Sequence, residues 1–380
     1  MLRLSELKLP LDHPDSAIEP AVVARLAEIG AAAKELVRFR VFRRAHDARK
    51  RSDIKLTYII DVELQDEALV LKRLEARPHP HCGVTPDMAY RFVAKAPERS
   101  THLRPVVIGM GPCGLFAGLI LAQMGFRPII LERGKAVRER TKDTWGLWRC
   151  NELNPESNVQ FGEGGAGTFS DGKLYSQIKD PKHYGRKVLD EFVKAGAPED
   201  ILYLSRPHIG TFRLVSMVEK MRAQIHQLGG EVRFQHRVED IDIDNGKVRG
   251  LRLSTGETLR CDHVVLAVGH SARDTFQMLH DRGVYIEAKP FSLGFRIEHP
   301  QGVIDRSRFG KFAGHEKLGA ADYKVVQQQR TRGVQLLHVS GRHGRRGDLG
   351  AGARRDQWHE PVFARRAQCE RGNRRRYHAG

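Results

Sequence analysis

Short apolar runs alternate with apolar residues at helical spacing along much of this chain, a pattern that predicts an α/β fold. The clearest stretch is 105–134, in which two short apolar runs flank a glycine-rich turn and a helical segment expected at 112–124. The second run ends in an acidic residue. This order of strand, turn, helix and strand predicts half of a dinucleotide-binding domain.

The glycines of the turn have separate expected roles. Gly109 allows the tight turn, Gly111 leaves room for a pyrophosphate against the backbone, and Gly114 lets the helix pack closely on the strand. Pro112 and Cys113 lie at the start of the helix. Unpaired N–H groups and the helix dipole favour an anion there, so these residues are expected to bind the cofactor.

The acid that ends the second strand is Glu132, eighteen residues after Gly114, and Arg133 follows it. A carboxylate at this place can accept both ribose hydroxyls of an adenosine and would repel a 2′-phosphate. We therefore include Glu132 and Arg133 in the expected nucleotide site. The motif alone does not distinguish NAD from FAD.

A second glycine-rich block, NPESNVQFGEGGAGTFSDGKL at 154–174, favours FAD. A long bent cofactor needs further close approaches of backbone beyond the first loop. A mobile surface loop is the alternative interpretation. The residues expected to serve the cofactor or substrate in this block are Gly162, Gly164, Gly165, Gly167, Thr168, Ser170, Asp171 and Lys173.

Several blocks together resemble the bacterial FAD-dependent dehydrogenase family of largely unassigned substrate. Besides the two glycine-rich blocks they include FRVFRRAHDARKRSDI at 39–54, APEDILYLSRPHIGT at 197–211, LAVGHSARDTF at 266–276 and KPFSLGFRIEHPQ at 289–301. The resemblance extends from residue 1 to about residue 334. It implies a glutathione-reductase-type fold that binds FAD, redox chemistry on a small-molecule substrate, and NAD(P)H as a candidate electron partner.

The same resemblance implies roles for residues nearer the end of the cofactor domain. The apolar run 264–268 ends at Gly269, and it looks like the strand that returns under the adenine-bearing half of such flavoproteins. Val238, between Arg237 and Glu239, corresponds to the segment beside the adenine; an ordinary strand is the alternative. His270, next to Gly269, joins the expected cofactor residues.

Four segments are expected. Residues 1–98 form a small N-terminal α+β accessory domain, with strands such as KLTYIIDVEL and a helix at 20–37. Residues 99–288 form the Rossmann-like FAD-binding domain with inserted segments. Residues 289–334 begin an incomplete C-terminal or substrate domain, and residues 335–380 form an aberrant basic tail that we expect to be disordered.

The tail changes character near Val334. Residues 331–380 contain twelve Arg, no Lys and four acidic residues. Such an arginine bias is typical of a GC-rich gene read out of frame. Residues 335–339 and 357–363 can be written in codons that, read one base later, give residues like the family's continuation. We therefore expect a frameshift that truncates the family's C-terminal part, with weak FAD retention or aggregation of the product.

Composition narrows the class of protein. The chain of 380 residues is 40% hydrophobic, has no apolar run long enough to span a membrane, and lacks the apolar core of a signal peptide. These features predict a cytoplasmic protein. The five cysteines include no CxxC pair. No metal site is expected, although ARPHPHCGVTP at 76–86 contains two histidines and a cysteine; its prolines suit a linker.

No catalytic acid, base or nucleophile can be assigned from the sequence, because a flavin itself carries the electron transfer. His270, Arg273, and either Asp171 or Lys173 are the candidates near the reactive half of the cofactor, and Arg206 and His208 are polar candidates near the substrate. Two other functions stay open: an NAD-binding Rossmann enzyme without flavin, and a basic nucleic-acid-binding protein, suggested only by the net charge of +18. The oligomeric state is not predicted.

Overall fold

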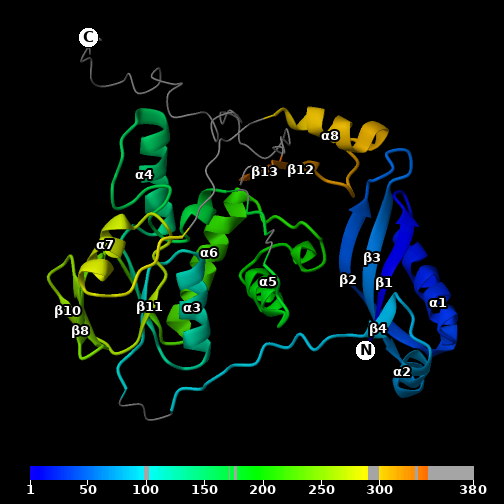
Figure 1. The fold of residues 1–380 in the computed structure, drawn as a ribbon, viewed down its shortest axis with the longest axis horizontal. Coiled ribbons are helices and arrows are strands. Elements are labelled where there is room, and N and C mark those ends of the chain that lie inside the picture. Colours follow the sequence, from blue (N-terminus) through cyan, green and yellow to red (C-terminus); the bar gives the residue numbers. More distant parts are fainter. Residues whose placement is uncertain (98–101, 171, 175–177, 290–298, 330–332, 341–380) are drawn as a thin grey trace, which may run out of the picture. The chain divides into compact units, whose positions relative to one another are not determined.

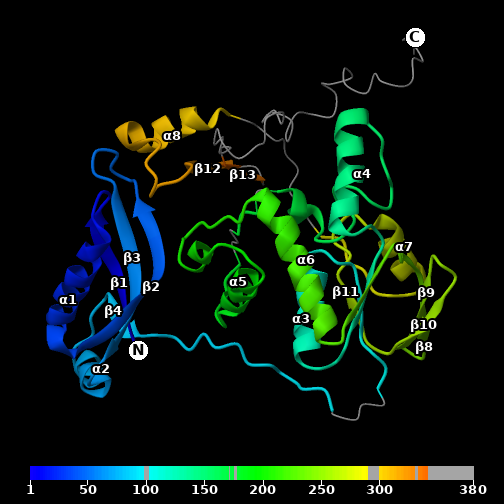
Figure 2. The same ribbon diagram turned by 180° about the vertical axis from the view of Figure 1, so that it is seen from behind.

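The computed structural model describes residues 1–97, 102–170, 172–174, 178–289, 299–329 and 333–340. The chain divides into two compact units. Unit 1 comprises residues 1–87, 202–206 and the part of 290–358 that is described, and unit 2 comprises residues 88–201 and 207–289. Figures 1 and 2 show the elements of both units from opposite sides.

Unit 1 begins with a βαββαβ arrangement around an antiparallel sheet in the order β2-β3-β1-β4. Its elements are β1 (Leu2–Pro10), η1 (Asp15–Ala17), α1 (Ile18–Glu28), η2 (Ala33–Glu35), β2 (Leu36–Asp47), β3 (Lys55–Leu64), α2 (Glu67–Ala76) and β4 (Cys82–Val84). This order of elements is that of a split βαβ, or ferredoxin-like, motif. The helix expected at 20–37 is shorter than predicted and ends at Glu28, because Gly30 adopts a left-handed conformation with φ of 75°.

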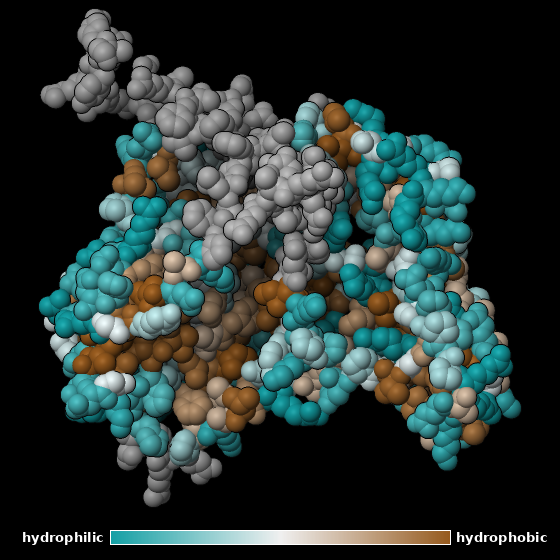
Figure 3. Space-filling view, viewed as in Figure 1, coloured by the Kyte–Doolittle hydropathy of each residue, from teal (hydrophilic) through white to brown (hydrophobic). Residues whose placement is uncertain are grey.

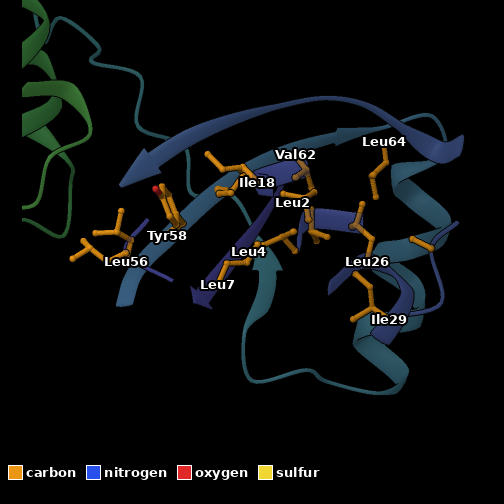
Figure 4. Close-up of a cluster of buried hydrophobic side chains, with 14 of the residues drawn as sticks. Leu2, Leu4, Leu7, Ile18, Leu26, Ile29, Leu56, Tyr58, Val62 and Leu64 are labelled. Carbon is orange, nitrogen blue, oxygen red and sulfur yellow. The ribbon is translucent and has the colours of Figure 1, made fainter. Parts of the chain in front are cut away.

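The core of unit 1 is apolar. Alternate residues of β1 and β3 point to one face of the sheet, where they meet the buried side of α1. Figure 4 shows this cluster, with Leu2 and Leu4 from β1, Leu26 from α1 and Val62 from β3. All four side chains are fully buried.

Later parts of the chain complete this core. The described residues after 298 form α8 (Gln301–Phe309), η5 (Gly310–Phe312) and a hairpin of β12 (Asp322–Gln329) with β13 (Gly333–Ser340). Phe309 is fully buried in the same cluster as the residues of β1 and β3. At the edge of β2, the backbone N–H of Arg44 donates to the carbonyl of Tyr203 at 2.7 Å. The described part of the segment assigned to a C-terminal domain therefore shares the core of the N-terminal strands.

Unit 2 contains the parallel sheet expected for a dinucleotide-binding domain. Its strands are β5 (Val106–Ile108), β6 (Ile129–Glu132), β7 (Glu231–Phe234) and β11 (Val264–Leu266), in the order β11-β5-β6-β7. In chain order this places the first strand beside the second and the second beside the third, with the last strand on the other side of the first. That is the arrangement of half of a doubly wound sheet.

Helices and a second, antiparallel sheet surround the parallel strands. The helices are α3 (Pro112–Gln123), α4 (Val137–Cys150), η3 (Ala166–Phe169), α5 (Tyr184–Lys194), η4 (Glu199–Leu202), α6 (Thr211–Gln227) and α7 (Arg273–Asp281). The antiparallel strands are β8 (Val238–Asp244), β9 (Lys247–Leu253) and β10 (Thr258–Arg260). In the space-filling view, hydrophobic residues reach the surface over the strands of unit 2 (Figure 3). Leu266, on the edge strand β11, is 44% exposed.

Candidate dinucleotide-binding site

The turn after β5 requires glycine for steric reasons that the structure makes explicit. Gly109 has a φ of 97°, and a Cβ there would lie 2.5 Å from the carbonyl oxygen of Ala267. A Cβ on Gly114 would lie 1.8 Å from the carbonyl oxygen of Gly109. Neither position can hold a side chain without moving backbone, which agrees with the roles expected for a tight turn and close helix packing.

Gly111 differs from the other two, because the space beside it is open. A Cβ on Gly111 would meet only the Cα of Gly165, at 3.8 Å, which is ordinary contact. Gly111 is the N-cap of α3, and the helix begins at Pro112 with no side-chain cap and no acidic residue in its first turn. The protein around this helix N-terminus therefore leaves an anion both space and N–H donors.

The second glycine block lies directly against the first loop. The backbone N–H of Gly164 donates to the carbonyl of Met110 at 2.8 Å. A Cβ on Gly165 would lie 2.9 Å from the Cα of Gly111, so the two loops approach backbone to backbone. The sequence predicted that both blocks serve one cofactor, and the structure brings Gly164, Gly165 and the first loop together.

Glu132, at the end of β6, is 4% exposed and its carboxylate accepts three backbone N–H groups. Met110 donates to Oε2 at 2.7 Å, and Gly134 and Gly162 each donate to Oε1 at 2.9 Å. Each carboxylate oxygen has room for about two donors, so Oε1 is filled and Oε2 has one position left. The expected contact with two ribose hydroxyls stays a prediction, and the free acceptor position suits one of them.

Arg140, on α4, is a buried residue of this region that the sequence did not point to. Its side chain is fully buried and donates to four backbone carbonyls of the second glycine block. The acceptors are Asn158, Val159, Glu163 and Gly165, at 2.7 to 2.8 Å. The segment around Arg140 is polar and shows no apolar stripe, so no periodic signal marked its buried face.

Glu163, in the second glycine block, is also fully buried. Its Oε2 accepts from the N–H of Val137, at the start of α4, at 2.7 Å and from Nη1 of Arg222 at 3.0 Å. Its Oε1 has no hydrogen-bond partner in the part of the chain that the structure describes. Burial raises the pKa of Glu163, and the hydrogen bond from Val137 and the charge of Arg222 oppose this shift.

A cavity of about 260 Å³ opens beside the end of β6. The residues that line it are Arg133, Lys135, Asn154, Glu156, Ser157, Gln235, Arg237 and Ser254. Ser157 is 1% exposed, and its hydroxyl has no partner among the described residues. A buried hydroxyl without a partner on the wall of a cavity is suited to bind a ligand there.

The cations that line this cavity are paired with acids. Arg133 donates to Glu156 at 2.9 and 3.1 Å and to Asp274, at the start of α7, at 2.9 Å. Arg237 donates to Glu156 at 2.8 Å and to Glu239 at 2.8 Å. Burial raises the pKa of Glu156, but hydrogen bonds and charge from Arg133 and Arg237 outweigh it and lower the pKa below its usual value. Because the charges are balanced, the cavity favours a neutral polar group over a further phosphate.

The other predicted cofactor residues are placed as follows. Val238, at the start of β8, is 5% exposed and pairs with Leu253. Gly269 and His270 follow β11 and are exposed. Ala267, two residues before Gly269, packs against Gly109, so this segment begins at the first loop.

Within the second block, Thr168 is 2% exposed and its hydroxyl donates to the carbonyl of Glu163 at 3.3 Å, which makes it part of the loop's own packing. Gly167 is exposed, as are Ser170 and Lys173. Asp171 lies outside the described residues. Arg206 forms an ion pair with Asp322 within unit 1, whereas His208 belongs to unit 2.

Cys113, one of the expected cofactor residues, has a free thiol, and its side chain is exposed in the first turn of α3. Among the described residues, no group of three His, Cys, Asp or Glu side chains is placed to hold a metal ion. No helix of the described chain is both long and apolar enough to cross a membrane.

Three parts of the chain match the models of known protein families. Residues 172–312 match the family model described as FAD dependent oxidoreductase. Residues 290–336 match the model of an FAD-dependent protein, C-terminal domain-like, and residues 1–63 match a domain of unknown function.

An uncharacterized protein of Clostridium beijerinckii is 40% identical to this chain over 332 residues, which are 86% of this chain and 60% of that protein. The chain thus spans 60% of the length of this curated relative. Among solved structures, THI4 of Thermovibrio ammonificans is similar at 20% identity, over 54% of this chain and 70% of that one, with a TM-score of 0.32. Glycine oxidase from Bacillus cereus is 17% identical over 48% of this chain and 58% of that one, with a TM-score of 0.26. At these low TM-scores the two solved structures support no statement about the fold or function of this chain.

Proposed function

We propose that the protein is a dehydrogenase that binds FAD in unit 2 and oxidises or reduces a small molecule of unidentified structure. The observation that carries this proposal is the approach of two glycine loops at the N-terminus of α3, where Gly111, unlike Gly109 and Gly114, leaves open space. In this proposal the pyrophosphate lies against Gly111, where the start of α3 offers N–H donors to its charge.

The neighbouring cavity suits the adenosine part of the same cofactor. It lies at the end of β6, where Glu132 keeps one acceptor position on Oε2 and Ser157 keeps an unpartnered hydroxyl. The guanidinium carbon of Arg133, on the wall of the cavity, lies 4.3 Å from the centre of the Phe161 ring, a contact that helps to hold Arg133 in place. Its paired charges suit an uncharged base and ribose.

When bound, FAD would supply the acceptor or donor of electrons. The residues of this chain would bind and orient it: Gly109, Gly111 and Gly114 by leaving room, and Pro112 and Cys113 by forming the start of the helix. We propose Gly269 and His270, after β11, and Lys173, in the second block, as the residues nearest the reactive end. NAD(P)H is the electron partner that the family resemblance suggests.

The glutathione-reductase-type arrangement is part of this proposal. The parallel order β11-β5-β6-β7 and the antiparallel strands β8–β10, inserted in the chain between β7 and β11, support it. The closing experiment is a visible absorption spectrum of the purified chain with bound flavin quantified after denaturation. A yellow protein with flavin near one equivalent is the expected result if the site is complete. Failure to take up added FAD both in the 380-residue chain and in a version with the reading frame restored after Val334 would contradict the proposal.

A second experiment concerns the reading frame. We propose that residues after Val334 are read out of frame, which would remove the late part of the fold that serves the flavin. The match to the C-terminal family model ends at residue 336, in support of this. A version with the frame restored after Val334 should retain more flavin than the 380-residue chain. Equal, stoichiometric flavin in both would refute the loss of function.

A further inference from the structure

Arg140 has an unusual combination of burial and hydrogen bonding. Long charged side chains are almost never fully buried unless they are paired, yet Arg140 has no exposed surface, and its hydrogen bonds to the described residues go to backbone carbonyls. The four carbonyls come from both ends of one short segment, 158–165. The guanidinium thus determines the path of this segment.

The segment is shaped to fit around Arg140. A Cβ on Gly162 would lie 2.3 Å from Cδ of Arg140, so glycine is needed where the side chain passes. On the far side, Nη1 holds the carbonyls of Glu163 and Gly165 at 2.7 and 2.8 Å. The intervening Gly164 turns its N–H to Met110 of the first loop. One side chain therefore connects α4 to the contact between the two glycine loops.

Arginine suits this position in a way that lysine does not. The planar guanidinium has five N–H donors at fixed angles, and four carbonyls are within its reach, whereas an ammonium offers three donors from a single atom. Burial lowers the pKa of Arg140 to about 10, and the charges of Glu132 and Glu163 oppose this shift. Arg140 is therefore charged at neutral pH, beside the loops that receive the pyrophosphate in the proposed complex.

We propose that Arg140 is a positioning residue for the cofactor: by holding the carbonyls of residues 158–165, it fixes the second glycine loop against Gly111 and so shapes the pyrophosphate site. This inference rests on the proposed FAD site. It assigns Arg140 to the phosphate part of that site and not to the adenosine cavity, whose lining does not include Arg140.

The test compares Arg140→Lys with Arg138→Lys in the full chain. Arg138 lies on the same helix, but it is bound to the carboxylate of Glu219 and its side chain is 71% exposed. Binding of FAD, ADP and adenosine is measured for each variant by titration. ADP reports on the phosphate and adenosine parts together, and adenosine reports on the cavity alone.

We expect Arg140→Lys to weaken FAD and ADP at least about tenfold, which is about 1.4 kcal/mol, and adenosine less than about twofold. Arg138→Lys should change none of them by more than about twofold. Unchanged ADP binding in Arg140→Lys would overturn the inference, as would equal losses for ADP and adenosine, because a general structural role moves both. If Arg140→Lys does not fold, Arg140→Gln is measured instead, and failure of both to fold would assign Arg140 to stability alone.

The two proposals can fail separately. If the wild-type chain binds neither FAD nor ADP, the proposed cofactor site is refuted, and with it the proposed role of Arg140. If the wild-type chain binds both ligands and the Arg140→Lys variant binds them equally well, the proposed cofactor site is retained. Only the proposed role of Arg140 is then refuted.

Discussion

Unit 1 and unit 2 bury different kinds of side chain. Among the described residues of unit 1, the buried polar or charged ones are His13 and Asp61, beside a large apolar core. Those of unit 2 are Glu132, Arg140, Thr144, Ser157, Asn158, Glu163, Thr168, Glu191 and Thr275. Most of them fall between residues 132 and 168, in and around the second glycine block. Burying polar groups is costly unless they are bonded, so their concentration there indicates a region shaped for a ligand and not for stability alone.

The largest effect should come from a glycine of the first loop. In Gly114→Ala the new Cβ would lie 1.8 Å from the carbonyl oxygen of Gly109, so backbone must move. We expect FAD affinity to fall by a factor of about 100 or more, and the free energy of unfolding by about 2 kcal/mol. The control is Gly83→Ala in β4, where a Cβ meets nothing within 4 Å. Equal effects of both substitutions would break the contrast between the units.

The next prediction concerns a substitution in unit 1 that should lower the free energy of unfolding without changing FAD affinity. Asp61, on β3 of unit 1, is 1% exposed and accepts from Arg3 at 2.7 and 3.0 Å. Asp61→Ala leaves a partly buried guanidinium with one partner fewer, so we expect a loss of about 3 kcal/mol in urea denaturation. FAD affinity of the remaining folded protein should be unchanged.

The matched control is Glu63→Ala, on the same strand, where Glu63 pairs with an exposed Arg38. It should cost less than about 1 kcal/mol, as exposed ion pairs do. A large loss of FAD affinity in Asp61→Ala would show that the apolar unit also shapes the cofactor site.

A smaller effect concerns the walls of the adenosine cavity. Glu156→Gln removes the carboxylate that holds Arg133 and Arg237, and we expect FAD affinity to fall about fivefold at neutral pH. Because the pKa of Glu156 is lowered in the folded protein, its ion pairs stabilise the fold above the unfolded pKa and are lost as pH falls through the lowered folded value. Thermal unfolding measured against pH should show this loss below about pH 4 in the wild type and not in Glu156→Gln. The same acid dependence in both proteins would contradict the assignment.

The smallest expected effect is a pH dependence of stability whose sign is opposite to the one expected for Glu156. The pKa of Glu163 is raised by burial, so its folded form holds a proton at pH values where the unfolded form has lost it. The stability of the wild type should therefore fall as pH rises from the unfolded pKa through the raised folded pKa. Glu163→Gln keeps an oxygen acceptor for Val137 and removes the titration. The difference in melting temperature between the two proteins should shift in favour of the variant over this interval, and a constant difference would show that Glu163 does not titrate there.

The sequence predicted the part of the site that depends on short, local rules. The strand, turn and helix of residues 105–124 follow from apolar runs and glycine spacing, and β5 and α3 lie where that pattern placed them. The predicted end of α1 was wrong. Alanines continue at helical spacing past Gly30, but the backbone leaves the helical conformation there.

The parts of the site that depend on distant contacts could not be predicted. Arg140 looks like one charge in a polar helix, and only the return of residues 158–165 buries it. Likewise Ser157 became a candidate only when the cavity beside β6 was visible. Local spacing carries no information about which loop a side chain will meet.

Some residues that complete the core of unit 1 lie late in the chain. Their position has a consequence for synthesis on the ribosome. Phe309 is fully buried among side chains of the first strands, and Tyr203 supplies a backbone partner to β2. Pairings of such large sequence separation form slowly. We therefore expect the domain that is translated first to reach its final packing last, after the parallel sheet of unit 2 has all its strands. Until then its leucine-rich face would depend on chaperones for protection from other nascent chains.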